Sequence, residues 1–177
     1  NEPIKTFSIG LNTESPDCKA ARTVAKYLNS DHTEVNFTVA QGIKALRSVI
    51  KSLETYDTTT IRASVPMWLL SKYISENTEC RVILSGEGSD EILGGYLYFH
   101  SAPGVEEFAS ENMRRLRLIH QFDGLRADRC AGAHGLDLIV PFLDKTFIDY
   151  CMRINQNGKI DKIEKRILRE AFEGYLP

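Results

Sequence analysis

The alternation of two hydrophobic patterns in the first third of the chain constrains the fold most. Residues 4–11 and 34–39 alternate apolar and polar side chains, a pattern typical of strands. Between them, and again over 43–53, apolar residues recur at helical spacing. Ser15-Pro16 supplies an N-cap and a first-turn proline for the first of these helices. Strand, helix, strand and helix in this order predict βαβ units with a parallel sheet.

A third expected strand ends in a glycine-rich acidic turn. Val82 to Leu84 is an apolar run that predicts a strand buried on both faces, and Ser85-Gly86-Glu87-Gly88-Ser89-Asp90-Glu91 follows it. Glycines let backbone N–H groups approach a ligand, and ligands bind at the carboxyl ends of parallel strands. The carboxylates of this turn are costly to crowd together unless a cation is near. Taken alone, the turn leaves open a solvated acidic loop and a nucleotide or metal site.

Composition narrows the class of protein. The 177 residues suffice for one domain with a core, and a net charge of −2 gives no support for nucleic acid or an anionic membrane as the main partner. The four cysteines are scattered, which favours free thiols in a reducing compartment over zinc ligation. We find no signal peptide and no apolar run of membrane-spanning length, and we expect a cytoplasmic protein. The chain opens almost directly into a strand, so we expect a piece of a longer protein.

The sequence around the acidic turn resembles a known family. Ser85 to Glu91, continued by Gly94-Gly95-Tyr96-Leu97-Tyr98-Phe99-His100, resembles the synthetase domain of glutamine-hydrolysing asparagine synthetases. Thr59-Thr60-Ile61-Arg62 matches the family's Thr-Thr-x-Arg element. The block from Gly135 to Asp144 also resembles the family, although Asp137 and Ile139 replace its glutamate and arginine. The resemblance extends over nearly the whole chain.

The resemblance implies a fold and a reaction. The fold is α/β, a Rossmann-like doubly wound parallel sheet of the adenine nucleotide alpha-hydrolase or N-type ATP pyrophosphatase type, with a helical C-terminal part. Residues 1–177 then belong to one synthetase domain, with the sheet and nucleotide site in 1–100 and mainly helices in 101–177. The reaction is ATP-dependent conversion of aspartate to asparagine through β-aspartyl-AMP, using ammonia from glutamine. ATP and Mg²⁺ are the implied cofactors, and a homodimer is a possible assembly.

The resemblance also implies roles for individual residues. Ser85, Gly86 and Gly88 would contact the adenylate through the turn backbone, and Ile9 would contact the adenine or ribose. The residues implied to hold the pyrophosphate and the amino-acid carboxylate are Thr59, Thr60 and Arg62. Asp90 would be a magnesium ligand, and Glu87 would assist the attack of ammonia. Asp123 would face the substrate ammonium with support from Arg126, although this pair at i, i+3 spacing can also be a simple salt bridge.

Three family elements do not occur in this sequence. The Ser-Gly-Gly-Leu-Asp-Ser pyrophosphate loop and the glutaminase domain with its cysteine nucleophile are both missing, as is the family's catalytic lysine. We therefore expect that this chain alone cannot form asparagine. A non-catalytic nucleotide-binding or interaction module that kept the fold is the alternative function. A related adenylating enzyme, such as a β-lactam-forming synthetase, is a weaker alternative because it shares less of these motifs.

Overall fold

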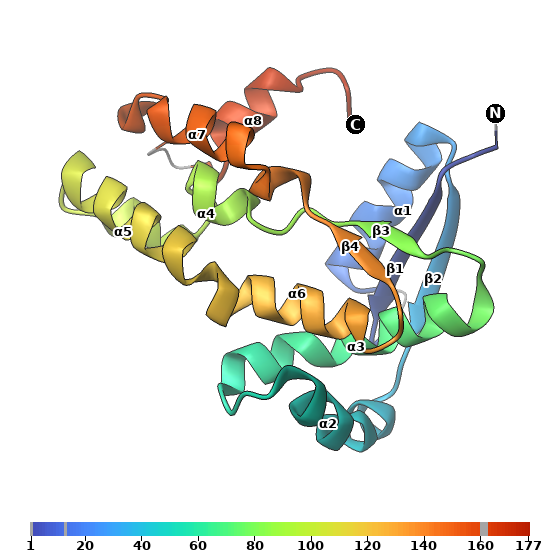
Figure 1. Ribbon diagram of the computed structural model, residues 1–177. Coiled ribbons are helices and arrows are strands. Elements are labelled where there is room, and N and C mark those ends of the chain that lie inside the picture. The colour runs from blue at the N-terminus through green and yellow to red at the C-terminus, as the bar shows by residue number, and fades with distance from the viewer. Residues whose placement is uncertain (1, 13, 160–162) are drawn as a thin grey trace. The chain divides into compact units, whose positions relative to one another are not determined.

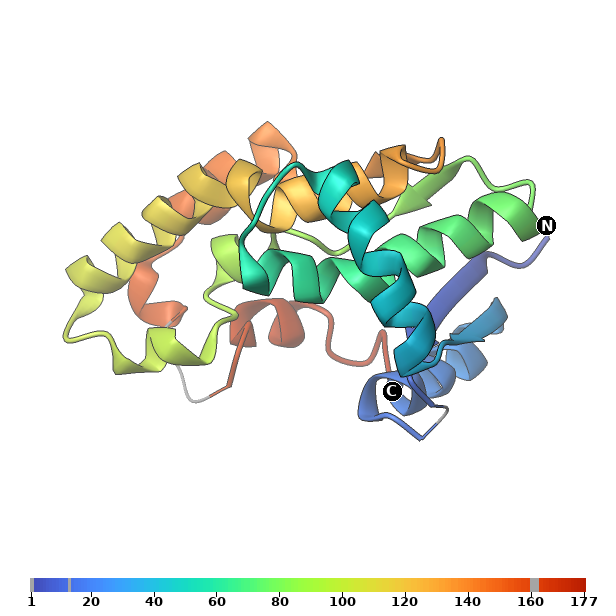
Figure 2. The ribbon, with the colours of Figure 1, turned by 90° about the horizontal axis from the view of Figure 1, so that it is seen from below.

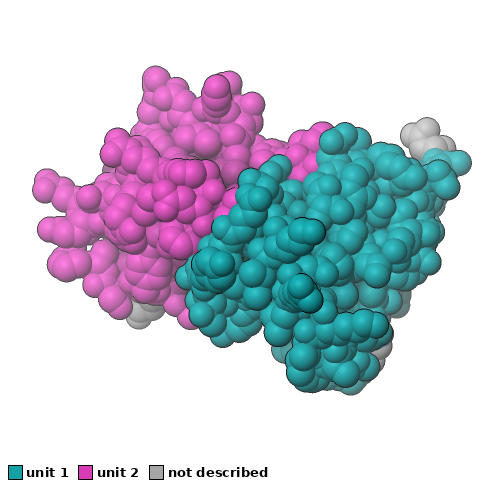
Figure 3. Space-filling view, turned by 60° about the horizontal axis from the view of Figure 1, so that its bottom comes forward, with its two compact units in different colours: residues 1–82, 126–137, 174–177 teal, residues 83–125, 138–173 magenta. Residues whose placement is uncertain are grey.

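The computed structural model describes residues 2–12, 14–159 and 163–177, and it is an α/β structure with mostly helices and small parallel sheets (Figure 1). The chain divides into two compact units, and each is described by itself. Unit 1 contains residues 1–82, 126–137 and 174–177, and unit 2 contains residues 83–125 and 138–173 (Figure 3).

Unit 1 contains a parallel strand pair and its helices. The strands are β1 (Lys5–Gly10) and β2 (Asp31–Asn36), and the helices are α1 (Pro16–Leu28), α2 (Val39–Leu53), α3 (Thr58–Asn77) and most of α6 (Asp123–Gly132). β1 pairs with β2 in parallel from Lys5 opposite Asp31 to Gly10 opposite Asn36. Ser15 caps α1 as expected, because its side chain accepts a hydrogen bond from the Cys18 amide, and proline follows it.

The core of unit 1 lies between α2, α3 and α6. Its buried members are Ala45, Val49, Leu53, Val65 and Cys130, and Phe37, Ile61, Met67, Trp68 and Leu69 pack against them. α2 carries its buried residues on one face, as its helical spacing predicts, and it packs chiefly on α3 (Figures 1 and 2). This packing buries one stripe of each helix and gives the unit its stability.

α3 begins earlier than the sequence predicts. The apolar residues Met67, Trp68, Leu70, Tyr73 and Ile74 predict a helix over about 63–76 after a polar junction, but α3 runs from Thr58 to Asn77. Asp57 is its N-cap, and the Asp57 side chain accepts a hydrogen bond from the Thr60 amide at 2.7 Å. The aspartate, rather than a threonine hydroxyl, therefore satisfies an orphan N–H group of the first turn.

The described residues of unit 2 form helices joined by short 3₁₀ turns, and they include the first residues of α6. The helices are α4 (Ser89–Leu93), α5 (Val105–Leu118), α7 (Lys145–Arg153) and α8 (Arg166–Ala171), and the 3₁₀ turns are η1 (Leu97–Ser101), η2 (Ile119–Gln121), η3 (Pro141–Leu143) and η4 (Gln156–Gly158). Ile92, Leu93 and Cys151 form a buried cluster with side chains of α5, α7 and α8. Phe108 is fully buried, and its ring packs edge-on against the Phe99 ring with 5.0 Å between the ring centres. The apolar spacing of Ile163, Ile167 and Leu168 predicts one helix, but the last helix begins at Arg166, and Ile163 precedes it and is exposed.

A second strand pair joins β3 (Val82–Leu84) to β4 (Asp137–Ile139). The Asp137 amide donates to the Arg81 carbonyl and the Ser85 amide donates to the Ile139 carbonyl, so the pairing advances in the same direction along both strands, as in a parallel pair. The expectation that β3 is buried on both faces is wrong, because Val82 and Leu84 are 50% and 70% exposed. Among the described residues the strands form two two-stranded sheets, and a single doubly wound sheet stays a prediction.

The expectations for the cysteines and for the aromatic run are confirmed in part. The four cysteines are free, and Cys18, Cys130 and Cys151 are buried. The aromatic run that contains Tyr98 and Phe99 predicts core packing for both side chains, and Phe99 is buried but Tyr98 is 48% exposed. Within the residues described, none of the helices is long and apolar enough to cross a membrane.

Candidate functional site

The turn after β3 contains an exposed glycine, Gly86, and a buried glycine, Gly88. Gly86 is exposed, and a Cβ placed there would meet no atom within 4 Å. Gly88 is buried at the N-cap of α4 with φ of 90°, and a Cβ there would lie 2.3 Å from Leu143 Cδ2. The backbone at Ser85-Gly86 is therefore accessible to a ligand, whereas Gly88 has a conformational and packing reason to be glycine.

The carboxylates that follow this turn have different surroundings. Glu87 is half-buried. Lys165 Nζ forms an ion pair with Asp90 Oδ1 at a distance of 3.0 Å. Gly95 packs closely against Asp90, because a Cβ on Gly95 would lie 2.0 Å from Asp90 Oδ1. The apolar spacing of the last helix predicts that Lys165 is solvated, but Lys165 supplies a cation to the crowded acidic turn.

Asp90 is the residue implied to bind magnesium, and the described surroundings fit only part of such a site. Asp90 already holds an ammonium group, which shows that its carboxylate accepts a cation. In residues 2–12, 14–159 and 163–177, however, no three histidine, cysteine or carboxylate side chains are grouped to hold a metal ion. One carboxylate suits a magnesium ion that is also bound by nucleotide phosphates, but not an ion held by protein ligands alone.

Glu91 lies at the centre of a buried polar network in unit 2. The Glu91 side chain is 2% exposed and accepts a hydrogen bond from the Tyr96 hydroxyl. The same hydroxyl lies 3.1 Å from Asp123 Oδ2. Arg115 Nη2 lies 3.7 Å from Asp123 Oδ2, and Arg115 Cζ lies 5.0 Å from the centre of the Tyr96 ring. Burial and the nearby Asp123 raise the pKa of Glu91, and burial together with the Glu91 carboxylate raises the pKa of the Tyr96 phenol.

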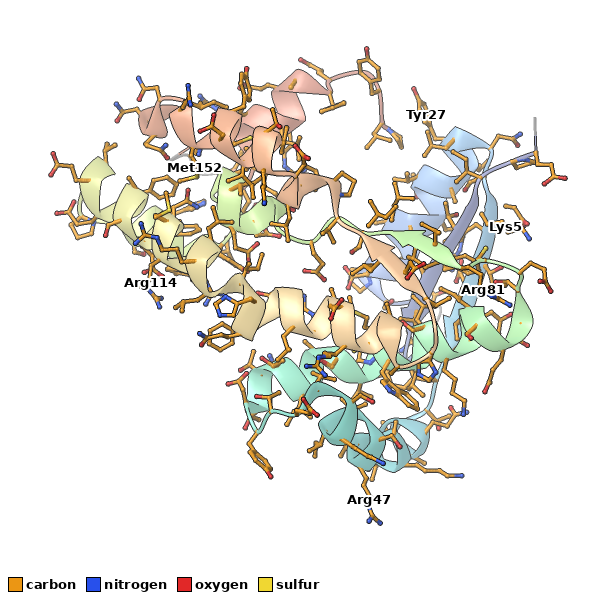
Figure 4. All side chains as sticks on the ribbon, viewed as in Figure 1. Lys5, Tyr27, Arg47, Arg81, Arg114 and Met152 are labelled. Carbon is orange, nitrogen blue, oxygen red and sulfur yellow. The ribbon has the colours of Figure 1, made fainter. Side chains whose placement is uncertain are left out.

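This network corrects the sequence interpretation of Arg115. The sequence predicts that Arg114, Arg115 and Arg117 lie together on a solvated helix face. Arg114 does lie at the outer edge of α5, where it pairs with Glu111 (Figure 4). The Arg115 side chain, in contrast, is 24% exposed. The helical spacing of the sequence could have predicted this burial, because Arg115 follows the fully buried Phe108 by seven positions, about two turns, and lies on the same helix face.

The other residues implied to act on the substrates belong to unit 1. Thr59 and Arg62 are exposed in the first turns of α3, and Thr60 is 4% exposed. Hydrogen bonds from the Thr60 side chain and amide lower the pKa of Asp57. Ile9 faces Val35 across the strand pair.

Asp123 and Arg126 lie on the same helix, α6, on either side of the boundary between the units. The structure therefore brings Asp123 together with Glu91 and Tyr96 in unit 2, and it places Ile9, Thr59, Thr60, Arg62 and Arg126 in unit 1.

Comparison with known proteins assigns the chain to a family. The family model described as asparagine synthase matches residues 1–118 and 102–177, which together span the chain. The chain belongs to the asparagine synthase family. Two curated members, the asparagine synthetases [glutamine-hydrolyzing] of Mus musculus and Homo sapiens, are each 54% identical to it over 173 residues. Asparagine synthetase B [glutamine-hydrolyzing] of Escherichia coli is 50% identical over 177 residues.

These relatives are much longer than the chain. The match covers 97% of the chain but 31% of the mouse and human proteins, and 98% of the chain but 32% of the E. coli protein. The chain thus spans about a third of the length of the family members that it matches.

Proposed function

We propose that this chain contributes to the synthetase site of a glutamine-hydrolysing asparagine synthetase. The observation that carries the proposal is identity of 50–54% along nearly the whole chain to proteins named for that activity. In the proposed reaction the β-carboxylate of aspartate attacks the α-phosphate of ATP, which forms β-aspartyl-AMP and releases pyrophosphate. Ammonia from glutamine then attacks the acyl carbon, loses a proton and displaces AMP, so that asparagine is formed.

The turn after β3 is proposed to hold the adenylate. Its exposed Gly86 leaves space for a ligand against the main chain, and the N–H groups of a glycine-rich turn suit phosphate and ribose oxygens. Ser85 adds a hydroxyl, and Ile9 offers an apolar side chain for the adenine or ribose. Gly88 supports the turn by allowing the left-handed backbone at the start of α4.

Charged groups are proposed to stabilise the phosphates and to orient aspartate. The exposed Arg62 can form two bonds with a planar or tetrahedral anion, and the exposed Thr59 adds a hydroxyl donor from the same helix. Thr60 is proposed to support this helix start, because its hydroxyl donates to Asp57. Magnesium, held by Asp90 together with the phosphates, would neutralise charge that develops on the phosphate oxygens. Asp123 would bind the substrate ammonium.

The buried network gives Asp123 a defined position for this role. Tyr96 and Arg115 both contact its carboxylate, and this limits the orientations that the side chain can take. Arg126 follows on the same helix and is proposed to support it. Glu87, half-buried in the turn, is proposed to act as base or electrostatic partner for the incoming ammonia.

The proposal extends to the context of the chain. We propose that its strands complete a Rossmann-like sheet of the N-type ATP pyrophosphatase type in the longer protein. A glutaminase domain of that protein would supply ammonia. The protein would act in the cytoplasm, and its proposed assembly is a homodimer. The alternative is an inactive nucleotide-binding module.

An assay of the longest natural protein that contains this chain tests the proposal. We expect pyrophosphate release that requires aspartate, ATP and magnesium, followed by asparagine formation from glutamine or ammonia. Glu87→Gln is expected to reduce asparagine formation more than aspartate-dependent ATP–pyrophosphate exchange, because its proposed role belongs to the second step. Arg47→Met is the matched control, since Arg47 on α2 points away from the rest of the unit (Figure 4).

Two results would contradict the proposal. ATP binding without aspartate-dependent pyrophosphate release would favour the inactive module. Equal loss of both partial reactions in Glu87→Gln would remove the role assigned to Glu87. For the 177-residue chain alone, we expect no asparagine under the same conditions.

A further inference from the structure

Unit 1 contains a cavity whose lining residues, apart from Ile9, have no role in the proposed reaction. Its volume is about 440 Å³, and it lies beside the β1–β2 pair. The residues that line it come from the strand ends, from α2 and from the C-terminal half of α3, and those that matter for its chemistry are Ile9, Val35, Phe37, Lys44, Trp68 and Lys72. Only Ile9 is also among the residues implied to contact the nucleotide.

The cavity follows from the way the helices pack. α3 packs on β1, and α2 packs chiefly on α3 instead of on the strands (Figure 2). The side chains of Ile9 and Val35, which are partners across the strand pair, therefore meet a hollow bordered by both helices. A cavity of this size falls within the range of about 300–1,000 Å³ that is usual for small-molecule sites.

The walls combine aromatic rings with a small excess of positive charge. Phe37 and Trp68 provide flat apolar surface, and the Trp68 indole N–H already donates to Ser52 Oγ at 3.3 Å. Lys72 Nζ lies 3.9 Å from Glu76 Oε1, so the charges of these two side chains largely cancel. Lys44 also lines the cavity, and in the part of the chain that the structure describes it has no ion pair.

We propose that this cavity binds a small molecule with a flat apolar body and a single negative charge. The aromatic rings would contact the body of the ligand, and Lys44 would pair with its carboxylate or sulfonate. The cavity shares Ile9 with the proposed nucleotide site, but none of the residues proposed to hold the phosphates line it, and binding there does not depend on the proposed synthetase activity.

Trp68 makes the test specific to this cavity, because it is the only tryptophan of the chain. We would titrate the 177-residue chain with the aromatic sulfonate 8-anilinonaphthalene-1-sulfonate and record quenching of Trp68 and energy transfer to the probe. We expect saturable binding of one probe per chain. Lys44→Met should weaken it by about fivefold, the loss of one partly exposed ion pair. Arg47→Met, a control on the same helix, should leave the affinity unchanged because Arg47 does not line the cavity.

A neutral probe distinguishes pairing with Lys44 from apolar binding alone. N-phenyl-1-naphthylamine should bind wild type and Lys44→Met equally, because it lacks the anionic group. Circular dichroism would show that Lys44→Met remains folded, and Lys44→Gln repeats the test with a polar side chain. Equal affinity of the sulfonate for wild type and both Lys44 variants would overturn the proposal. Displacement of the probe by ATP would also overturn it, since the cavity would then be part of the nucleotide site.

Discussion

Substitution of Gly88 by alanine is expected to destabilise unit 2 strongly. Gly88 has φ of 90°, and an added Cβ would lie 2.3 Å from Leu143 Cδ2 and 2.6 Å from Leu143 Cγ. An L-residue in a left-handed conformation costs about 1–2 kcal/mol, and overpacking at a buried position costs about 1–3 kcal/mol more. The free energy of unfolding should therefore fall by roughly 2–5 kcal/mol, a large part of the ~5–15 kcal/mol that stabilises a typical protein.

Gly86→Ala is the matched control for this prediction. A Cβ at Gly86 meets nothing within 4 Å, and an exposed substitution without such contacts changes stability by about 0.5 kcal/mol or less. Urea unfolding followed by circular dichroism would compare the variants, and hydrogen exchange would locate the loss in unit 2. Leu143→Ala combined with Gly88→Ala should recover part of the overpacking cost. Equal unfolding midpoints for Gly88→Ala and Gly86→Ala would refute the reasoning.

Three further predictions concern buried and half-buried side chains. Phe108→Ala should lower the free energy of unfolding by about 3–5 kcal/mol in urea unfolding, because the ring is fully buried. Arg115→Met should lower the free energy of unfolding by about 1 kcal/mol and speed amide hydrogen exchange near Asp123. Arg114→Met should change both quantities little, because Arg114 is exposed. Burial and the charge of Lys72 lower the pKa of His134, so the folded state favours the neutral ring. Thermal stability should therefore be full above the ordinary histidine pKa of about 6.5 and fall below it, and His134→Asn should reduce this slope.

Local patterns determined most of the secondary structure. The Ser15-Pro16 cap, the period of α2 and the strand before the acidic turn all depend on neighbours within a few residues, and sequence spacing reports such interactions directly. The start of α3 was missed because Asp57 caps it through its side chain, and several polar residues in a row offer competing caps. The exposure of Val82 and Leu84 was missed because an apolar run does not specify how many strands flank it.

The sequence by itself determined the family, the order of strands and helices, and the glycine-rich acidic turn, since these are written in contiguous residues. Only the tertiary structure decided which charges meet. Arg115 and Asp123 are eight positions apart, and Lys165 lies far along the chain from Asp90, yet each pair is in contact. The cavity beside Trp68 is likewise a result of helix packing. Such contacts depend on how separate elements pack, and the spacing of residues along one element does not contain that information.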